Sequence, residues 1–353
     1  MTSWLLRVLA IAALSIVLPS CTTGAPSIDP AAAGPAPAAR QGSAAKTHFV
    51  AGFEIDTVAE AATAAGEGVT TAIEYGEVPA GGALAKALLK NDISVIDGSV
   101  SADMYYWECH RTRTVAPPPS GYSNCNKADA HIITSTAALL RDVKALLARD
   151  ARRPYVVGYW VLDDWPSWDA GSGRDILPQI RALIADATPG YPAICGFGAE
   201  ISQGHRYGWD AGTAKNYSNA GCDMVAWYNY GPIDEYTHPS NGGKLNWSMA
   251  GLLPAMQRSL AKYGWQIART PLMGIGQAWS GPFNGPYYQP GLSRAQMLEQ
   301  AKAFCAFGAT SIAWYSWGDS GFMATTQTPD NSPAIAAGIR AGKNACAQIW
   351  RRG

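Results

Sequence analysis

The segment YVVGYWVLDDWPSW (155–168) ends an apolar run with two adjacent carboxylates, Asp163 and Asp164. Two carboxyl groups this close oppose each other's ionisation, so one tends to keep its proton while the other is charged. A neutral carboxylic acid beside a charged carboxylate is the arrangement that general acid–base catalysis requires. Trp160, Trp165 and Trp168 supply the partly apolar surroundings that favour the neutral acid. We therefore expect acid–base chemistry at this strand end, with Asp163 and Asp164 as catalytic residues.

Eight short apolar runs occur along the chain, and amphipathic segments separate them. Near-continuous apolar strands that alternate with helices indicate a parallel sheet covered on both faces. Eight such units within residues 47–353 predict a single-domain (β/α)8 barrel, or TIM barrel. The alternative is a doubly wound open sheet, but no GxGxxG loop follows the first run. The runs are 48–56, 69–77, 93–100, 155–164, 192–200, 223–231, 271–279 and 311–319.

Carboxylates are scarce in this chain, yet they end six of the eight runs. In a (β/α)8 barrel the active site lies at the C-terminal ends of the strands and in the loops that follow them. Some of these carboxylates are also explained as caps of the next helix, and some of the aromatic residues as core. Glu200, on the fifth run, is a third catalytic candidate. The substrate-binding candidates are Glu54, Glu74, Tyr75, Asp97, Trp165, Trp227, Tyr228, Gln277, Trp279, Trp314 and Trp317.

The ending Asp163-Asp164-Trp165-Pro166 resembles the strand-four signature of barrel glycoside hydrolases, in which an Asn-Glu-Pro or Asp-Glu-Pro run supplies the general acid/base. The aromatic ends of the sixth and eighth runs resemble the sugar-stacking platforms of the same enzymes. The resemblance implies a glycoside hydrolase that acts on an extracellular or cell-envelope polysaccharide. The chain departs from the pattern twice. Aspartate replaces the usual glutamate on strand four, and Gln277 ends strand seven where that superfamily has a glutamate nucleophile.

Glycoside hydrolysis requires two carboxyl groups on either side of the scissile bond. They lie about 5–5.5 Å apart in retaining enzymes and about 6.5–9.5 Å apart in inverting ones. We expect Glu200 to be the partner of the two adjacent aspartates, with Glu74 and Asp97 as the next candidates. Gln277 favours a different interpretation, a non-catalytic barrel that binds carbohydrate or serves as a scaffold. The fold does not decide between the two, because this barrel supports many functions.

The N-terminal segment 1–21 has the features of an export signal: an early cation at Arg7, an apolar run, and small residues before Cys21. The ending LPSC (18–21) resembles the lipobox of bacterial lipoproteins, so Cys21 is the expected lipidation site. Residues 22–46 are rich in Ala, Pro and Gly, which is typical of a disordered tether. We therefore expect an exported protein that is lipid-anchored to the bacterial cell envelope. The alternative is a secreted protein.

Six cysteines remain after Cys21, and an even number in an exported chain indicates disulfides. Among several possible patterns, pairing neighbours in sequence is the simplest, and it places the first pair in an extended third βα loop, Ser101 to about Ala130. The chain has no zinc-binding spacing of Cys and His, so we expect no metal and no cofactor. Its neutral net charge argues against a nucleic-acid partner, and we expect a monomer. The predicted disulfides are Cys109–Cys125, Cys195–Cys222 and Cys305–Cys346.

Overall fold

A computed structural model describes residues 48–115, 133–163, 172–198, 214–229, 236–238, 243–245, 249–283, 287–289, 291–318 and 327–352. The predicted signal peptide with Cys21 and the predicted tether lie outside these residues and stay predictions. The helices within the described ranges include none that is long and apolar enough to cross a membrane. Four further predicted residues also lie outside the described ranges: Asp164, Trp165, Glu200 and Cys125.

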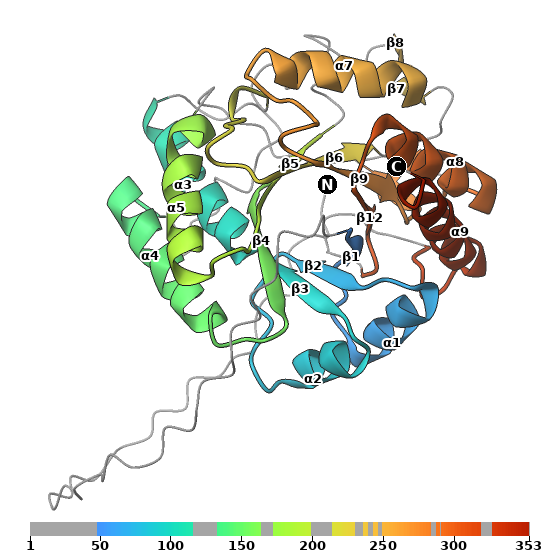
Figure 1. Cartoon of the computed structure of the whole chain (residues 1–353), viewed down its shortest axis with the longest axis horizontal. Helices are drawn as coiled ribbons and strands as arrows, with labels where there is room; N and C mark the ends of the chain where they lie inside the picture. Colours follow the sequence, from blue (N-terminus) through green and yellow to red (C-terminus); the bar gives the residue numbers. More distant parts are fainter. Residues whose placement is uncertain are drawn as a thin grey trace, which may run out of the picture. The chain divides into compact units, whose positions relative to one another are not determined.

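Eight parallel strands close into a barrel in the order β1-β12-β9-β6-β5-β4-β3-β2 (Figure 1). Each strand falls within one of the eight predicted runs, so the (β/α)8 barrel is confirmed and the open sheet is excluded. The strands are β1 (Val50–Phe53), β2 (Thr71–Glu74), β3 (Ser94–Asp97), β4 (Val156–Leu162), β5 (Ala193–Phe197), β6 (Met224–Asn229), β9 (Leu272–Gln277) and β12 (Ser311–Tyr315).

Helices surround the barrel on its outside (Figure 1). Local sequence sets their ends: α1 follows a capping box in which Thr57 and Glu60 satisfy each other's backbone N–H groups, and it stops at Gly68, whose φ of 82° suits glycine. Small hairpins follow β6 (β7, Tyr236–His238, and β8, Gly243–Leu245) and β9 (β10, Gly281–Phe283, and β11, Tyr287–Gln289). The helices are α1 (Val58–Glu67), α2 (Ala83–Lys90), α3 (Ser99–Val115), α4 (Thr136–Asp150), α5 (Ser172–Ala187), α7 (Met249–Ala261), α8 (Arg294–Phe307) and α9 (Pro333–Trp350).

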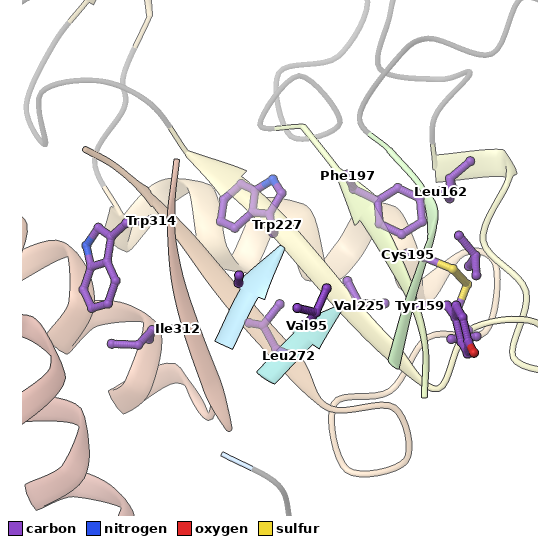
Figure 2. Close-up of a cluster of buried hydrophobic side chains, with 14 of the residues drawn as sticks. Val95, Tyr159, Leu162, Cys195, Phe197, Val225, Trp227, Leu272, Ile312 and Trp314 are labelled. Atoms are coloured by element: carbon purple, nitrogen blue, oxygen red, sulfur yellow. A yellow bond between two sulfur atoms is a disulfide. The ribbon is translucent and has the colours of Figure 1, made fainter. Parts of the chain in front are cut away.

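The barrel has two apolar layers, because side chains along each strand alternate between its inside and its outside. On β1, Ala51 and Phe53 belong to the layer that fills the barrel, while Val50 belongs to the layer under the helices. Figure 2 shows part of this outer layer, where Val95 and Ile312 are among the labelled side chains. Each fully buried aliphatic or aromatic side chain contributes about 1.5–3 kcal/mol to the stability of the folded state. The two layers together hold the strand ends in place.

The third βα segment differs from the prediction, because α3 occupies the first half of the stretch that we expected to be a loop. Val100, Met104 and Trp107 are buried at the spacing of one helix face. In the sequence this helical spacing was hidden by the many aromatic and proline residues of 101–130 as a whole. Trp107 is therefore a core residue.

Two of the predicted disulfides are confirmed, and neither lies in the third βα segment. Cys195–Cys222 joins β5 to the residues just before β6, and Cys305–Cys346 joins α8 to α9. Cys109, on α3, is disulfide-bonded. Because Cys125 lies outside the described residues, the pair Cys109–Cys125 stays a prediction.

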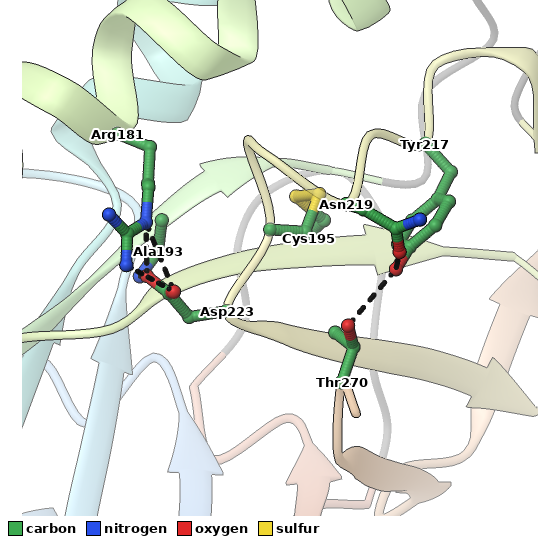
Figure 3. The surroundings of a disulfide bond; sticks show 8 residues. Arg181, Ala193, Cys195, Tyr217, Asn219, Asp223 and Thr270 are labelled. Carbon is green, nitrogen blue, oxygen red and sulfur yellow. Dashed lines mark hydrogen bonds and ion pairs between the residues drawn. A yellow bond between two sulfur atoms is a disulfide. The ribbon is translucent and has the colours of Figure 1, made fainter. Parts of the chain in front are cut away.

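Polar contacts near Cys195–Cys222 fasten the beginnings of β5 and β6 (Figure 3). Asp223 pairs with Arg181 at 2.9 Å and accepts a hydrogen bond from the Ala193 N–H at 3.1 Å. The Tyr217 hydroxyl lies 3.1 Å from Thr270 Oγ1. These contacts lie at the beginnings of the strands, opposite the strand ends where the fold places its active sites.

Candidate active site

Asp163 directly follows β4 and accepts hydrogen bonds from two other side chains. Its Oδ1 accepts from the Tyr228 hydroxyl at 2.8 Å and from Trp160 Nε1 at 3.2 Å. The Tyr228 hydroxyl also lies 2.8 Å from the Tyr75 hydroxyl. Because Trp160 and Tyr228 belong to the inner layer, Asp163 is held at the C-terminal mouth of the barrel. We call Asp163, Tyr228, Tyr75 and Trp160 the Asp163 network.

Five aromatic rings pack together at the same end of the barrel, and we call them the aromatic floor. Four of them are buried, and the Tyr75 side chain is half-buried, so the floor is a rigid support for Asp163. Phe53 is at its centre, with ring centroids 5.8 Å from Tyr75, 5.4 Å from Trp160, 5.6 Å from Tyr228 and 5.4 Å from Tyr315.

The sequence predicted part of this arrangement. Asp163, Tyr75 and Tyr228 are predicted site residues that the structure brings together. Phe53 and Tyr315 were missed, although each is the last residue of its strand. Because side chains alternate along a strand, the sequence could have placed these two rings inside the barrel. That step requires knowing which face of each strand points inward.

Gln277 and Trp279 lie inside the barrel but are completely buried. The Gln277 Nε2 donates a hydrogen bond to the Trp279 carbonyl oxygen at 2.7 Å. This amide therefore stabilises the backbone after β9. An uncharged amide at this position cannot act as a carboxylate nucleophile.

Three of the predicted sugar-stacking tryptophans belong to the outer layer, which corrects that prediction. Trp227, Trp314 and Trp317 are at most 2 % exposed and pack under the helices. Trp227 Nε1 donates to the Gly198 carbonyl oxygen at 3.0 Å, and its ring meets Phe304 edge-on. Figure 2 shows Trp227 and Trp314 on this side of the strands. Their side chains fill the core between barrel and helices, so they present no ring to a sugar.

Glu54 directly follows β1, and Glu74, the last residue of β2, contacts the turn between β1 and α1. Glu74 Oε1 accepts a hydrogen bond from the Ile55 N–H at 3.0 Å, which anchors that turn. Burial raises the pKa of Glu74 well above its ordinary value, and the nearby Asp56 carboxylate adds to the effect. Glu54 is 6 % exposed and adopts a φ of 58°, which is uncommon for a residue other than glycine. Because Ile73 faces into the barrel, Glu74 faces outward and shapes the turn.

Asp97 faces the helix layer, which corrects the prediction that it binds substrate. Its neighbour Ile96 points into the barrel, and Asp97 Oδ1 accepts a hydrogen bond from the Ser99 N–H at the start of α3, at 2.8 Å. Asp97 is therefore explained as a helix cap.

Asp97 has charged neighbours in Asp150, Arg153 and Glu77, and we call these four residues the outer carboxylate cluster. Arg153 pairs with Asp150 at 2.8 Å and also with Glu77. Asp150 is 1 % exposed, and burial together with the Asp97 charge raises the pKa of Asp150 to about 7, against the opposing effect of Arg153. Burial also raises the pKa of Asp97. Within the described part of the chain, no group of three or more His, Cys, Asp or Glu side chains could hold a metal ion.

Several solved structures with a similar fold are glycoside hydrolases. A β-galactosidase from Marinomonas ef1 is 12 % identical with a TM-score of 0.52, over 86 % of this chain and 59 % of that one. A β-galactosidase from Halorubrum lacusprofundi is 13 % identical with a TM-score of 0.52, over 86 % and 58 %. A thermostable mutant of a xylanase from Cellvibrio japonicus is 10 % identical with a TM-score of 0.51, over 84 % and 98 %.

The match is one of architecture. No protein-family model and no curated protein sequence matches the chain. The chain spans less than two thirds of the length of the two galactosidases. At these identities the similarity establishes the fold, and the chain shares with these glycoside hydrolases a (β/α)8 barrel.

Proposed function

We propose that the protein is a glycoside hydrolase that cleaves O-glycosidic bonds with Asp163 as a catalytic carboxylate. The observation that carries the proposal is the position of Asp163, at the mouth of the barrel with two donors on one carboxylate oxygen. The shared fold of the structurally similar glycoside hydrolases supports it. In this fold, strand ends supply the catalytic groups.

The hydrogen bonds favour one of the two roles that glycoside hydrolysis requires. Tyr228 and Trp160 are neutral donors, and donors aimed at a carboxylate stabilise its charged form. Asp163 is therefore the charged carboxylate, which either attacks the anomeric carbon or takes a proton from the attacking water. The proton donor to the leaving oxygen is then a second carboxyl group. Asp164 and Glu200 are our candidates, both from the sequence.

The substrate and location follow from the sequence prediction. We propose that the enzyme acts on an extracellular or cell-envelope polysaccharide while anchored through Cys21. A secreted form is the alternative. Absence of lipid on Cys21 in the purified protein, measured by mass spectrometry, would contradict the anchor without affecting the proposed chemistry.

The proposal is tested by incubating the full-length protein with a panel of polysaccharides and measuring released reducing ends. We expect turnover on at least one of them, and a loss of about 10²–10⁴-fold in Asp163→Asn. The Asp164→Asn and Glu200→Gln variants identify the proton donor, because its loss is rescued by substrates with a good leaving group. Full turnover in the Asp163→Asn variant rules out the proposed role.

A second candidate function is a carbohydrate-binding or scaffolding barrel without catalysis. The specific observation in its favour is Gln277, a buried amide that contacts the backbone where the superfamily has its nucleophile. This candidate predicts that glycans bind, as measured by calorimetry, with no product after long incubation. Product formation that depends on Asp163 excludes it.

A further inference from the structure

We propose that Tyr75 and Tyr228 are positioning residues, whose hydroxyl groups form a relay that keeps Asp163 charged. The inference deepens the proposed function and rests on it for the catalytic meaning of Asp163. The relay spans three strands of the barrel: Tyr75 directly follows β2, Tyr228 lies on β6, and Asp163 directly follows β4. The two links in this chain are each 2.8 Å long.

The directions of the hydrogen bonds follow from counting protons. A tyrosine hydroxyl has one proton to donate, and a charged carboxylate can only accept. When Tyr228 donates its proton to Asp163 Oδ1, it has none left for Tyr75. The 2.8 Å contact between the two hydroxyls then requires Tyr75 to donate to Tyr228. All protons of the relay therefore point toward Asp163.

A proton on Asp163 would disfavour these hydrogen-bond directions. If Oδ1 carried it, Tyr228 would have to turn its own proton away from the carboxyl group, and Tyr75 would have to reverse as well. Trp160 Nε1 cannot adapt, because an indole N–H only donates, and it is aimed at the same oxygen at 3.2 Å. If the other oxygen carried the proton, Oδ1 would become a weaker, uncharged acceptor for two donors. In both cases the charged form of Asp163 is the one that the network stabilises.

The aromatic floor prevents the hydroxyls from moving away. The Tyr228 ring is 2 % exposed and packs against Phe53, Trp160 and Tyr315, with centroids 5.6, 6.1 and 6.2 Å apart. The Tyr75 ring also contacts Phe53, at 5.8 Å. Because the rings are fixed by packing, the hydroxyl positions are set before any substrate arrives, which is the condition for electrostatic preorganisation.

The test compares Tyr228→Phe and Tyr75→Phe with Tyr159→Phe as the matched control. Tyr159 lies on β4 one residue before Trp160, is equally buried, and belongs to the outer layer. Two quantities are measured: the midpoint of Asp163 titration by carbon-13 carboxyl NMR, assigned with Asp163→Asn, and the acidic limb of the pH profile of kcat/KM. We expect Tyr228→Phe to raise both by about one pH unit, since it removes a hydrogen bond to a charged group. Tyr75→Phe raises them by less, and Tyr159→Phe leaves them unchanged.

The two readouts separate this inference from the proposed function. If the NMR midpoint of Asp163 rises in Tyr228→Phe while Asp163→Asn keeps full turnover, the relay is correct and the proposed function is wrong. If Asp163→Asn loses turnover but both tyrosine variants titrate like Tyr159→Phe, the relay is overturned and the proposed function stands. A Tyr75→Phe variant identical to wild type, with a raised midpoint in Tyr228→Phe, overturns the part of the relay that extends to β2.

Discussion

Two neighbouring strands of the barrel lead to aspartates with opposite surroundings. Asp97 ends β3 and faces the helix layer, where its carboxylate neighbours are Asp150 and Glu77. Asp163 follows β4 and faces the barrel mouth, where neutral donors from Tyr228 and Trp160 meet it. The residue type and the strand position are nearly the same. The face of the sheet and the chemistry of the partners distinguish a structural carboxylate from a candidate catalytic one.

The carboxyl groups of the outer carboxylate cluster differ in pKa: Arg153 lowers the pKa of Glu77, while burial raises the pKa of Asp97 and raises that of Asp150 to about 7. The buried guanidinium of Arg153 pairs with Asp150 and with Glu77, and the partly exposed Arg149 pairs with Glu77 at 3.3 Å. The Asp163 network instead holds its carboxylate with donors that carry no charge. The barrel thus places carboxyl groups on both faces of its strands, among different kinds of partner.

Removing Arg153, the buried cation of the outer carboxylate cluster, should lower the free energy of unfolding more than any other change considered below. Arg153→Met leaves Asp150 and Glu77 without their shared partner, and breaking a buried ion pair in this way costs about 3–5 kcal/mol. Urea unfolding at pH 7 measures the loss. Arg149→Met is the matched control, because its side chain is 46 % exposed and its pair with Glu77 contributes about 0–1 kcal/mol. Equal stability of the two variants would mean that the cluster is not an electrostatic unit.

The next effect is a dependence of stability on pH. The pKa of Asp150 is about 7 in the folded protein and has its ordinary value of 3.8 in the unfolded chain. The folded state therefore binds the proton more tightly, so stability falls as pH rises from about 4 to about 7 and then levels off. Between pH 5 and pH 8 the wild type should lose on the order of 2 kcal/mol in its free energy of unfolding. The Asp150→Asn variant should lack this loss. Unfolding curves at both pH values check this, and equal losses in variant and wild type would contradict it.

The smallest effect is expected from Glu77→Gln. The Glu77 side chain is 37 % exposed, so its pairs with Arg149 and Arg153 are screened by water, and its loss should cost less than about 1 kcal/mol. Its charge also raises the pKa of Asp150, so this variant lowers the folded-state pKa of Asp150 and the fall in stability should level off at a lower pH. Unfolding between pH 5 and pH 8 measures both. A cost as large as that of Arg153→Met would place the electrostatic centre of the cluster at Glu77.

The sequence predicted the strands far better than it predicted which way their last residues face. Buried parallel strands are apolar on both sides, so all eight runs were recognisable. Trp227 and Tyr228 are adjacent, so one must face out and the other in, and no local signal says which. On β4 the pairing with β5 shifts between Trp160 and Leu162, so counting alternate residues from Trp160 does not place Asp163. These choices depend on strand register, which only the closed barrel sets.

If Asp163, and not Asp97, carries the chemistry, the variants Asp163→Asn and Asp97→Asn should differ sharply in activity. Both replace a carboxyl group by an amide of the same shape at the ends of neighbouring strands. On a polysaccharide that the wild type cleaves, we predict that Asp163→Asn lowers kcat by about 10²–10⁴-fold and still binds the glycan, while Asp97→Asn keeps the wild-type rate. Loss of turnover in Asp97→Asn with wild-type rates in Asp163→Asn would contradict the catalytic role of Asp163.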